Sequence, residues 1–120
     1  VTQKARFRFT LPPWFVDTGT VQLRVRAGMI TTVSDTSATV DVNAYKSDED
    51  GSVGADICAT AAQSCNSLTK ANLDFTITSS GLNAGDTLDV LVTVAITGSA
   101  TGTAVIAEIR KLGFLLDIKG

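Results

Sequence analysis

The chain has 120 residues, a formal net charge of −2 and a sequence pI near 4.8. This length suits one domain, residues 1–120, with a single core that needs neither disulfide nor metal. Aromatic residues make up only 6% of the chain, and abundant valine and threonine favour strands over helices. The longest apolar run is too short to span a membrane, and the opening VTQKARFRF has no apolar signal core. We therefore expect no membrane partner.

The absence of histidine excludes most hydrolase mechanisms. Ser-His-acid and Cys-His arrangements both require it, as do histidine-ligated metal sites. The glycines form neither a phosphate-binding loop nor a dinucleotide fingerprint, and no spacing of carboxylates indicates a pair across a cleft. We expect a non-enzymatic protein with no catalytic residues, metal, cofactor or small-molecule substrate.

Charge is divided unevenly along the chain. Most of the acids lie between residues 35 and 89, whereas the first 34 residues hold Asp17 and five bases, Lys4, Arg6, Arg8, Arg24 and Arg26. Four arginines outside any recognisable nucleic-acid-binding module make only a small basic footprint, so no nucleic acid partner is expected. If the arginines share one sheet they crowd one face, and the expected acidic partners are Asp41, Asp74 and Asp89. Pairing within the chain is favoured, and the alternative is docking between subunits.

Five segments alternate apolar and polar residues with the period of two that is typical of half-buried strands. They are residues 4–11, 20–27, 37–46, 72–78 and 87–97. Pro12 and Pro13 end the first, because neither can donate to a strand ladder. In the last segment, Leu91 lies among polar residues on the outer face. This indicates that the outer face is partly covered, by its own chain or by a neighbouring subunit.

Residues 104–119 admit two interpretations. As a helix, they would form an apolar stripe of Val105, Ile109, Leu112 and Leu116. As a strand, the alternation changes phase and requires a bulge near residues 111–113. Gly113 is unfavourable inside a helix and common at a bulge, so the strand is favoured.

Residues 47–69 lose the alternation and predict a long polar loop, with a short helical turn around residues 59–64. The acidic cluster at residues 48–51 suggests calcium, but an EF-hand register would place Lys46 and Ile57 at the first and last ligand positions, so a solvated loop is favoured. Cys58 and Cys65 either close a small loop disulfide or remain two free thiols. Two cysteines without histidine do not make a conventional zinc site.

These elements predict an all-β protein of seven or eight strands with one long loop. Strands with one buried face are accounted for by two antiparallel sheets packed face to face. We therefore expect an antiparallel β-sandwich, jelly-roll-like, in a single domain.

The sequence also resembles a known group of proteins. The motifs are ARFRFTLP at residues 5–12, Trp14-Phe15, GTVQLRV at residues 19–25, LNAGDTL at residues 82–88 and KLGFLLDI at residues 111–118. They resemble small β-sandwich proteins of tailed bacteriophages, in which a phenylalanine-rich strand ends in Leu-Pro and leads into a Gly-Thr-Val turn. The paired cysteines in a long loop depart from that pattern.

The resemblance implies a virion structural protein on the outer surface of an icosahedral head. Such decoration or cement proteins bind the major capsid protein, often as trimers, and bridge capsid subunits without catalysis. In that role we expect the basic early strands and the acidic middle of the chain to supply complementary surfaces. Trp14 and Phe15 would form an apolar anchor, and Arg6, Arg8, Arg24, Arg26 and Leu91 are further candidate interface residues.

Two other functions remain open from the residues themselves. A glycan- or receptor-binding module of a tail appendage or secreted protein would use exposed aromatics, and only Trp14 and Tyr45 suit that role. Trp14, beside two prolines and Phe15, is expected to cover the core rather than to bind sugar. A pilus-like or surface-layer subunit would instead assemble with copies of itself.

Overall fold

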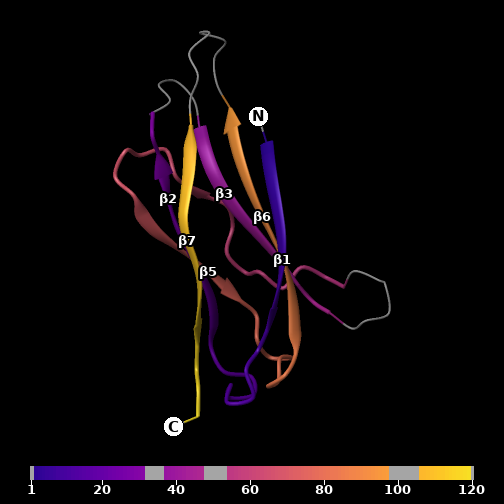
Figure 1. Ribbon diagram of the computed structural model, residues 1–120. Helices are drawn as coiled ribbons and strands as arrows, with labels where there is room; N and C mark the ends of the chain where they lie inside the picture. The colour runs from indigo at the N-terminus through magenta and orange to yellow at the C-terminus, as the bar shows by residue number, and fades with distance from the viewer. Residues whose placement is uncertain (1, 32–36, 48–53, 98–105, 120) are drawn as a thin grey trace.

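A computed structural model describes residues 2–31, 37–47, 54–97 and 106–119, and the described residues form seven strands in two antiparallel sheets (Figure 1). One sheet has the order β1-β6-β3-β4 and the other β5-β2-β7. The strands are β1 (Thr2–Thr10), β2 (Val21–Met29), β3 (Ser37–Lys46), β4 (Gln63–Ser64), β5 (Ala71–Ile77), β6 (Thr87–Thr97) and β7 (Ala107–Leu116). The prediction of an all-β antiparallel sandwich is confirmed. Every connection between strands except that from β3 to β4 passes from one sheet to the other.

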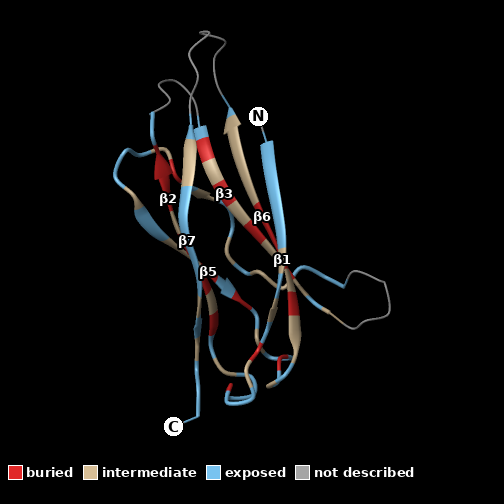
Figure 2. Cartoon of the chain, in the orientation of Figure 1, coloured by how far each residue is buried: buried red, intermediate tan, exposed pale blue. Residues whose placement is uncertain are grey.

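The alternation of the sequence places the core between the sheets. In β6, Leu88, Val90 and Val92 face inward and are buried, and the inward residues of β2 and β3 are buried with them (Figure 2). These side chains form one hydrophobic cluster, which Phe15, Phe75 and Leu82 join from loops and β5. A strand pattern of period two can bury one face in this way only if a second sheet covers it.

The strand interpretation of the last segment is confirmed for Ala107–Leu116. β7 pairs with β2 along its whole length, and the register shifts from Arg26 opposite Lys111 to Ala27 opposite Ile109. Arg110 is thus the extra residue of a β-bulge, just ahead of the predicted residues 111–113. Because the bulge changes the phase, both Ile109 and Leu112 lie on the inward face of β7.

The long polar segment is not the free loop that the sequence predicted. No helical turn occurs at residues 59–64; β4 forms there and pairs with Thr39 and Val40 of β3. The amide of Ile57 donates to Ala44 of β3, and the amide of Ala59 donates to Thr76 of β5. Gln63 Nε2 also donates to the Asp74 carbonyl at 2.8 Å. Residues 54–70 therefore join the two sheets along one flank of the sandwich.

A turn between β1 and β2 closes one end of the molecule against the end of the chain. Phe15 forms an isolated bridge with Ile118, and the Thr20 amide donates to Asp117 Oδ2 at 2.8 Å. Gly19 lies so close to this contact that an added Cβ would be 2.9 Å from Cβ of Asp117. The small residue is needed for this approach, and the turn holds Trp14 at the end of the sandwich.

Candidate functional site: the open flank between β1 and β7

The sandwich has a second flank, lined by β1 and β7, which we call the open flank. β1 ends one sheet and β7 ends the other, so each has one edge without a neighbouring strand among the described residues. The two strands meet through aromatic rings: Phe9 stacks on Phe114 with centroids 4.0 Å apart, and Phe7 meets the same ring edge-on at 6.2 Å. Side chains, rather than backbone hydrogen bonds, therefore connect the sheets here.

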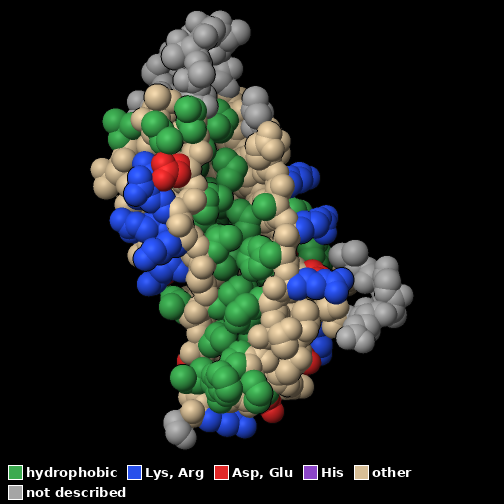
Figure 3. All heavy atoms as spheres, in the orientation of Figure 1, with side chains coloured by type: hydrophobic (Ala, Val, Ile, Leu, Met, Phe, Trp, Pro, Cys, Tyr) green, Lys and Arg blue, Asp and Glu red, His purple; other side chains and the backbone are tan. Residues whose placement is uncertain are grey.

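Apolar side chains remain exposed on this flank although they point inward. Leu112 is 46% exposed and Ile109 is 36% exposed, both on the face of β7 that turns toward β1. On β1 the inward-facing Ala5 is also exposed. Figure 3 shows an apolar stripe running along this side of the molecule, with Lys and Arg side chains on both sides of it. Exposed apolar stripes of this kind mark interaction surfaces in folded proteins.

The arginines do not crowd one face, because β1 and β2 belong to different sheets. Arg8 pairs with Asp89 at 2.8 Å on the first sheet. On the second sheet, Arg24 binds both carboxylate oxygens of Asp74, at 2.8 and 3.0 Å. Two of the three expected acidic partners are thus confirmed. Asp41 Oδ1 instead accepts from the adjacent Val42 amide at 2.9 Å.

The bidentate contact changes the acid–base properties of both partners. The hydrogen bond from Arg24 holds the pKa of Asp74 below its ordinary value, and the same contact raises the pKa of Arg24. Both side chains are at least a third exposed, so this ion pair contributes little to the stability of the fold.

Other cations beside the open flank have no acidic partner in the described part of the chain. They are Lys4 and Arg6 on the outer face of β1, Lys111 on the outer face of β7, and Arg26, whose guanidinium donates to the neutral Asn72 at 3.2 Å. The rims on both sides of the apolar stripe are therefore positively charged.

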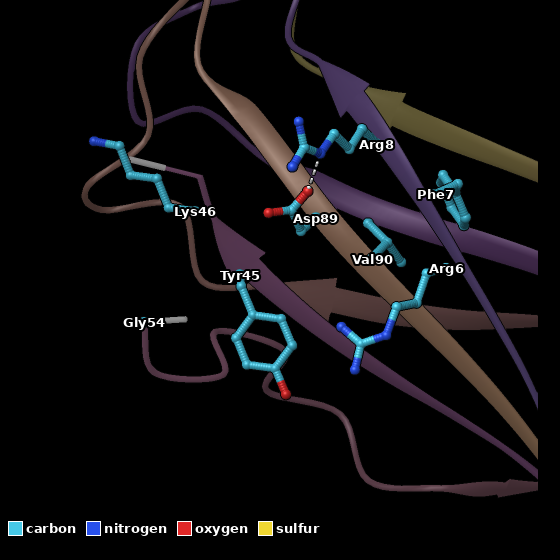
Figure 4. Close-up of a pocket in the computed structure, with 8 residues that line it drawn as sticks. All are labelled: Arg6, Phe7, Arg8, Tyr45, Lys46, Gly54, Asp89 and Val90. Carbon is cyan, nitrogen blue, oxygen red and sulfur yellow. Dashed lines mark ion pairs between the residues drawn. The ribbon is translucent and has the colours of Figure 1, made fainter. Parts of the chain in front are cut away.

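A hollow of about 400 Å³ lies on the outer face of the first sheet, beside β1 (Figure 4). Its lining includes Arg6, the Arg8–Asp89 ion pair, Lys46 and the Tyr45 ring. Lys46 is engaged with Asp86 at 3.4 Å and with the Gly81 carbonyl at 3.1 Å. The guanidinium of Arg6, which has no acidic partner among the residues that the structure describes, lies beside a phenol ring and suits an anionic or hydroxyl-bearing group.

The remaining candidate interface residues differ in accessibility. Trp14 is 56% exposed at the end of the molecule, whereas Phe15 is fully buried and covers the core in its place. The expectation that Trp14 covers the core is therefore wrong. Leu91 is only 8% exposed, flanked in register by Arg6 and Asn43. Its cover comes from its own chain, which leaves Trp14 and the arginines as accessible candidates.

Cys58 and Cys65 are free thiols in the structure rather than the disulfide that the sequence allowed. The Cys58 backbone forms a bridge with Ile77 of β5, while the Cys65 amide donates to Ala38 of β3. Each cysteine is thus attached to a different sheet. No sequence pattern indicated this, because residues 54–70 have no period from which their pairing could be predicted.

Metal binding and membrane insertion gain no support from the described residues. They contain no group of three or more side chains that could hold a metal ion, and the acidic cluster at residues 48–51 lies outside them. Nor does any helix in the described ranges have the length and apolar character needed to cross a bilayer.

Comparison of the chain with protein-family models, curated proteins and solved structures gave no match. The resemblance to phage sandwich proteins stays a prediction from the residues alone.

Proposed function

We propose that the chain is a non-enzymatic structural protein of a phage virion, which decorates the outside of an icosahedral head and stabilises it by bridging major capsid subunits. The observation that supports a docking role is the open flank, where Ile109 and Leu112 remain exposed although the strand pattern turns them inward. The phage context comes from the sequence motifs. A trimeric assembly is part of the same proposal.

The proposed mechanism involves no catalytic or covalent step. A rigid sandwich that buries apolar area across a boundary between capsid subunits resists their separation, because pulling them apart would return that area to water. Trp14 and the stripe supply apolar anchors, and the charged rims orient the docked protein. The paired arginines, Arg8 and Arg24, are already engaged with acids of their own chain and contribute less to such a contact.

The test starts from purified particles. We expect the chain to co-purify in a fixed ratio to the major capsid subunit, measured by quantitative mass spectrometry, and particles stripped of it to open at a lower temperature. Its absence from particles, or equal heat resistance of stripped and complete heads, would contradict the proposal.

A pair of variants locates the contact on stripped particles. Leu112→Asp should weaken rebinding by about tenfold or more, because a half-exposed leucine can no longer be buried. Leu68→Asp is the matched control, since Leu68 is 58% exposed on the opposite flank, within residues 54–70. Equal rebinding by both variants would exclude the open flank as the contact surface.

A second candidate function is glycan or receptor binding, favoured by the exposure of Trp14 and by the hollow with Tyr45 and Arg6. Aromatic rings at such positions stack on sugars, and a free guanidinium binds an acidic one. Glycan-array binding that is lost in Trp14→Ala or Tyr45→Ala would support this function. Binding that persists in both variants would exclude these rings as the site.

A further inference from the structure

We propose that the free edge of β1 accepts an extended strand from a different protein, one in which apolar residues alternate with aspartate or glutamate. This inference deepens the proposed function by naming the kind of segment that docks, and it rests on that function for its biological setting. It depends on three properties of the open flank within the described part of the chain: a backbone edge without a paired strand, incomplete cover of the apolar face, and cations without an acidic partner.

The backbone edge is the first property. All nine residues of β1 pair with β6 on one side, from Thr2 opposite Ala95 to Thr10 opposite Thr87. On the other side, no backbone hydrogen bond to another described residue engages Thr2–Thr10. Such a row of N–H and C=O groups is a template for one more strand, and added strands of this kind are a common mode of peptide recognition.

The second property is the incomplete cover of the apolar face. The Phe9–Phe114 stack holds the sheets together near one end of β1, whereas the inward-facing Ala5, nearer the N-terminus, is small and exposed. Leu112 and Ile109 are the exposed inward residues of β7 across the same flank. A strand beside residues 2–6 of β1 would direct every second side chain toward these groups. Apolar residues at those positions would complete the core.

Charge selects the remaining side chains of the incoming strand. Its outward positions would lie beside Lys4 and Arg6, which have no acidic partner among the described residues, and beside Arg8, which is paired with Asp89. Cross-strand neighbours of opposite charge are favourable and like charges are unfavourable. Carboxylates at alternate positions therefore fit this edge.

The same charges argue against a second copy of this chain as the occupant. Antiparallel pairing of β1 with another β1 centred on Arg6 would place Arg6 opposite Arg6 and Lys4 opposite Arg8. Pairing with the edge of another β7 would bring Lys111 against the same cations. Charged edge strands commonly prevent self-association in this way. The edge thus rejects copies of itself and admits an acidic strand.

The direct test uses a synthetic peptide as long as the 9 residues of β1, with valine alternating with aspartate or glutamate. Binding is measured by fluorescence anisotropy, and its position by shifts of backbone amide resonances. Two control peptides separate the contributions: one carries lysine in place of every acid, and the other carries N-methyl groups on alternate amides. The charge reversal Arg6→Glu is compared with Lys119→Glu, which makes the same change at the far end of the chain.

We expect the alternating acidic peptide to bind saturably, with the largest resonance shifts in β1, and neither control peptide to bind. The Arg6→Glu variant should bind the acidic peptide at least tenfold more weakly, whereas the Lys119→Glu variant should bind it as the unmodified chain does. Three results would overturn the inference: no binding, binding that N-methylation leaves unchanged, or shifts centred on another strand. Concentration-dependent self-association that Arg6→Glu abolishes would identify a second copy as the occupant instead.

The particle assay distinguishes this inference from the proposed function. If Arg6→Glu rebinds stripped particles as well as the unmodified chain does, while Leu112→Asp does not, the docking function stands and the strand inference fails. If the chain is absent from particles but binds the alternating peptide, the proposed function fails and the edge remains a strand-binding site.

Discussion

At the scale of single residues, the two cysteines illustrate how surroundings decide reactivity. Burial raises the pKa of both thiols above the ordinary 9.0, and the carboxylates of Asp56 and Asp41 raise that of Cys58 further. A thiol with a raised pKa is protonated at neutral pH and reacts slowly, since the thiolate is the nucleophile. Cys65 is buried and Cys58 is partly exposed.

We therefore predict slow alkylation of the folded chain by iodoacetamide at pH 7, with Cys58 modified before Cys65 and with faster reaction as the pH rises above 9. Mass spectrometry without reductant should find both residues alkylated after unfolding. A chain that takes up no label even when unfolded would show that the two cysteines form a disulfide.

Arg24 and Asp74 show what residue-level reasoning from the sequence could achieve. Both were assigned to outward positions of strands from the period of two, and Asp74 was one of three acids expected to pair with the arginines; the structure pairs it with Arg24. The sequence did not reveal that Arg6 and Arg24 lie on separate sheets, because pairing between strands depends on contacts distant in sequence. The crowding that a shared sheet would have caused therefore does not occur, and the arginines lie on two different sheets.

At the scale of elements, Asp56 is one of the residues that attach the segment of residues 54–70 to β3. The Asp56 carboxylate accepts from the amides of Ala44 and Cys58, both at 2.9 Å, and from Asn43 Nδ2 at 2.8 Å. Burial alone would raise the pKa of Asp56, but these three donors outweigh it, so the pKa falls below the ordinary 3.8. The carboxylate form is the one that holds the segment.

We predict that Asp56→Ala lowers the free energy of unfolding by about 1 kcal/mol at pH 7, because bonds to a partly exposed carboxylate are lost. The folded-state pKa lies below the unfolded one, so the contribution is complete above about pH 4 and disappears as the pH falls through the folded value. Urea titrations at several pH values measure this. Asp41→Asn, which alters a bond to the adjacent amide, is the control; equal effects of both variants would contradict the prediction.

The bulge in β7 shows a limit of predicting strand register from the sequence. The phase change between Ile109 and Leu112 was visible in the sequence, and Gly113 favoured the strand interpretation over the helix. The bulged residue is Arg110, however, while Gly113 lies in regular pairing opposite Arg24. Glycine indicates where a bulge is tolerated, but the register with β2 decides which residue is left unpaired.

At the scale of the whole molecule, the two flanks of the sandwich differ in how they are closed. Backbone hydrogen bonds from residues 54–70 seal one flank, whereas three phenylalanine rings connect the sheets at the other. Local opening should begin where few backbone bonds hold the structure. We therefore predict that, among the amides of the strands, those of β1 and β7 that face the open flank exchange their hydrogens fastest.

Amides in the middle of β2, β3 and β6 should exchange about a hundredfold or more slowly than these edge amides, because the core strands open only in larger unfolding events. Exchange followed by two-dimensional NMR measures every amide in one experiment. Addition of the alternating acidic peptide should slow exchange along β1 and leave the β5 edge unchanged. Uniform protection across β1 and β6 would contradict this view of the flank.

The sequence by itself determined the class of the fold and the inward face of most strands, because the period of two and the scarcity of helix-forming segments are local properties. It also identified the basic residues of β1 as candidate interface residues, but it did not reveal that Ile109 and Leu112 of β7 are exposed beside them. Only the tertiary structure decided which strands share a sheet, that residues 54–70 seal one flank, that Trp14 is exposed while Phe15 is buried, and that Leu91 is covered by its own chain. These depend on pairing between segments far apart in the chain, where the free energy comes from the assembled core and no short stretch of sequence carries the signal.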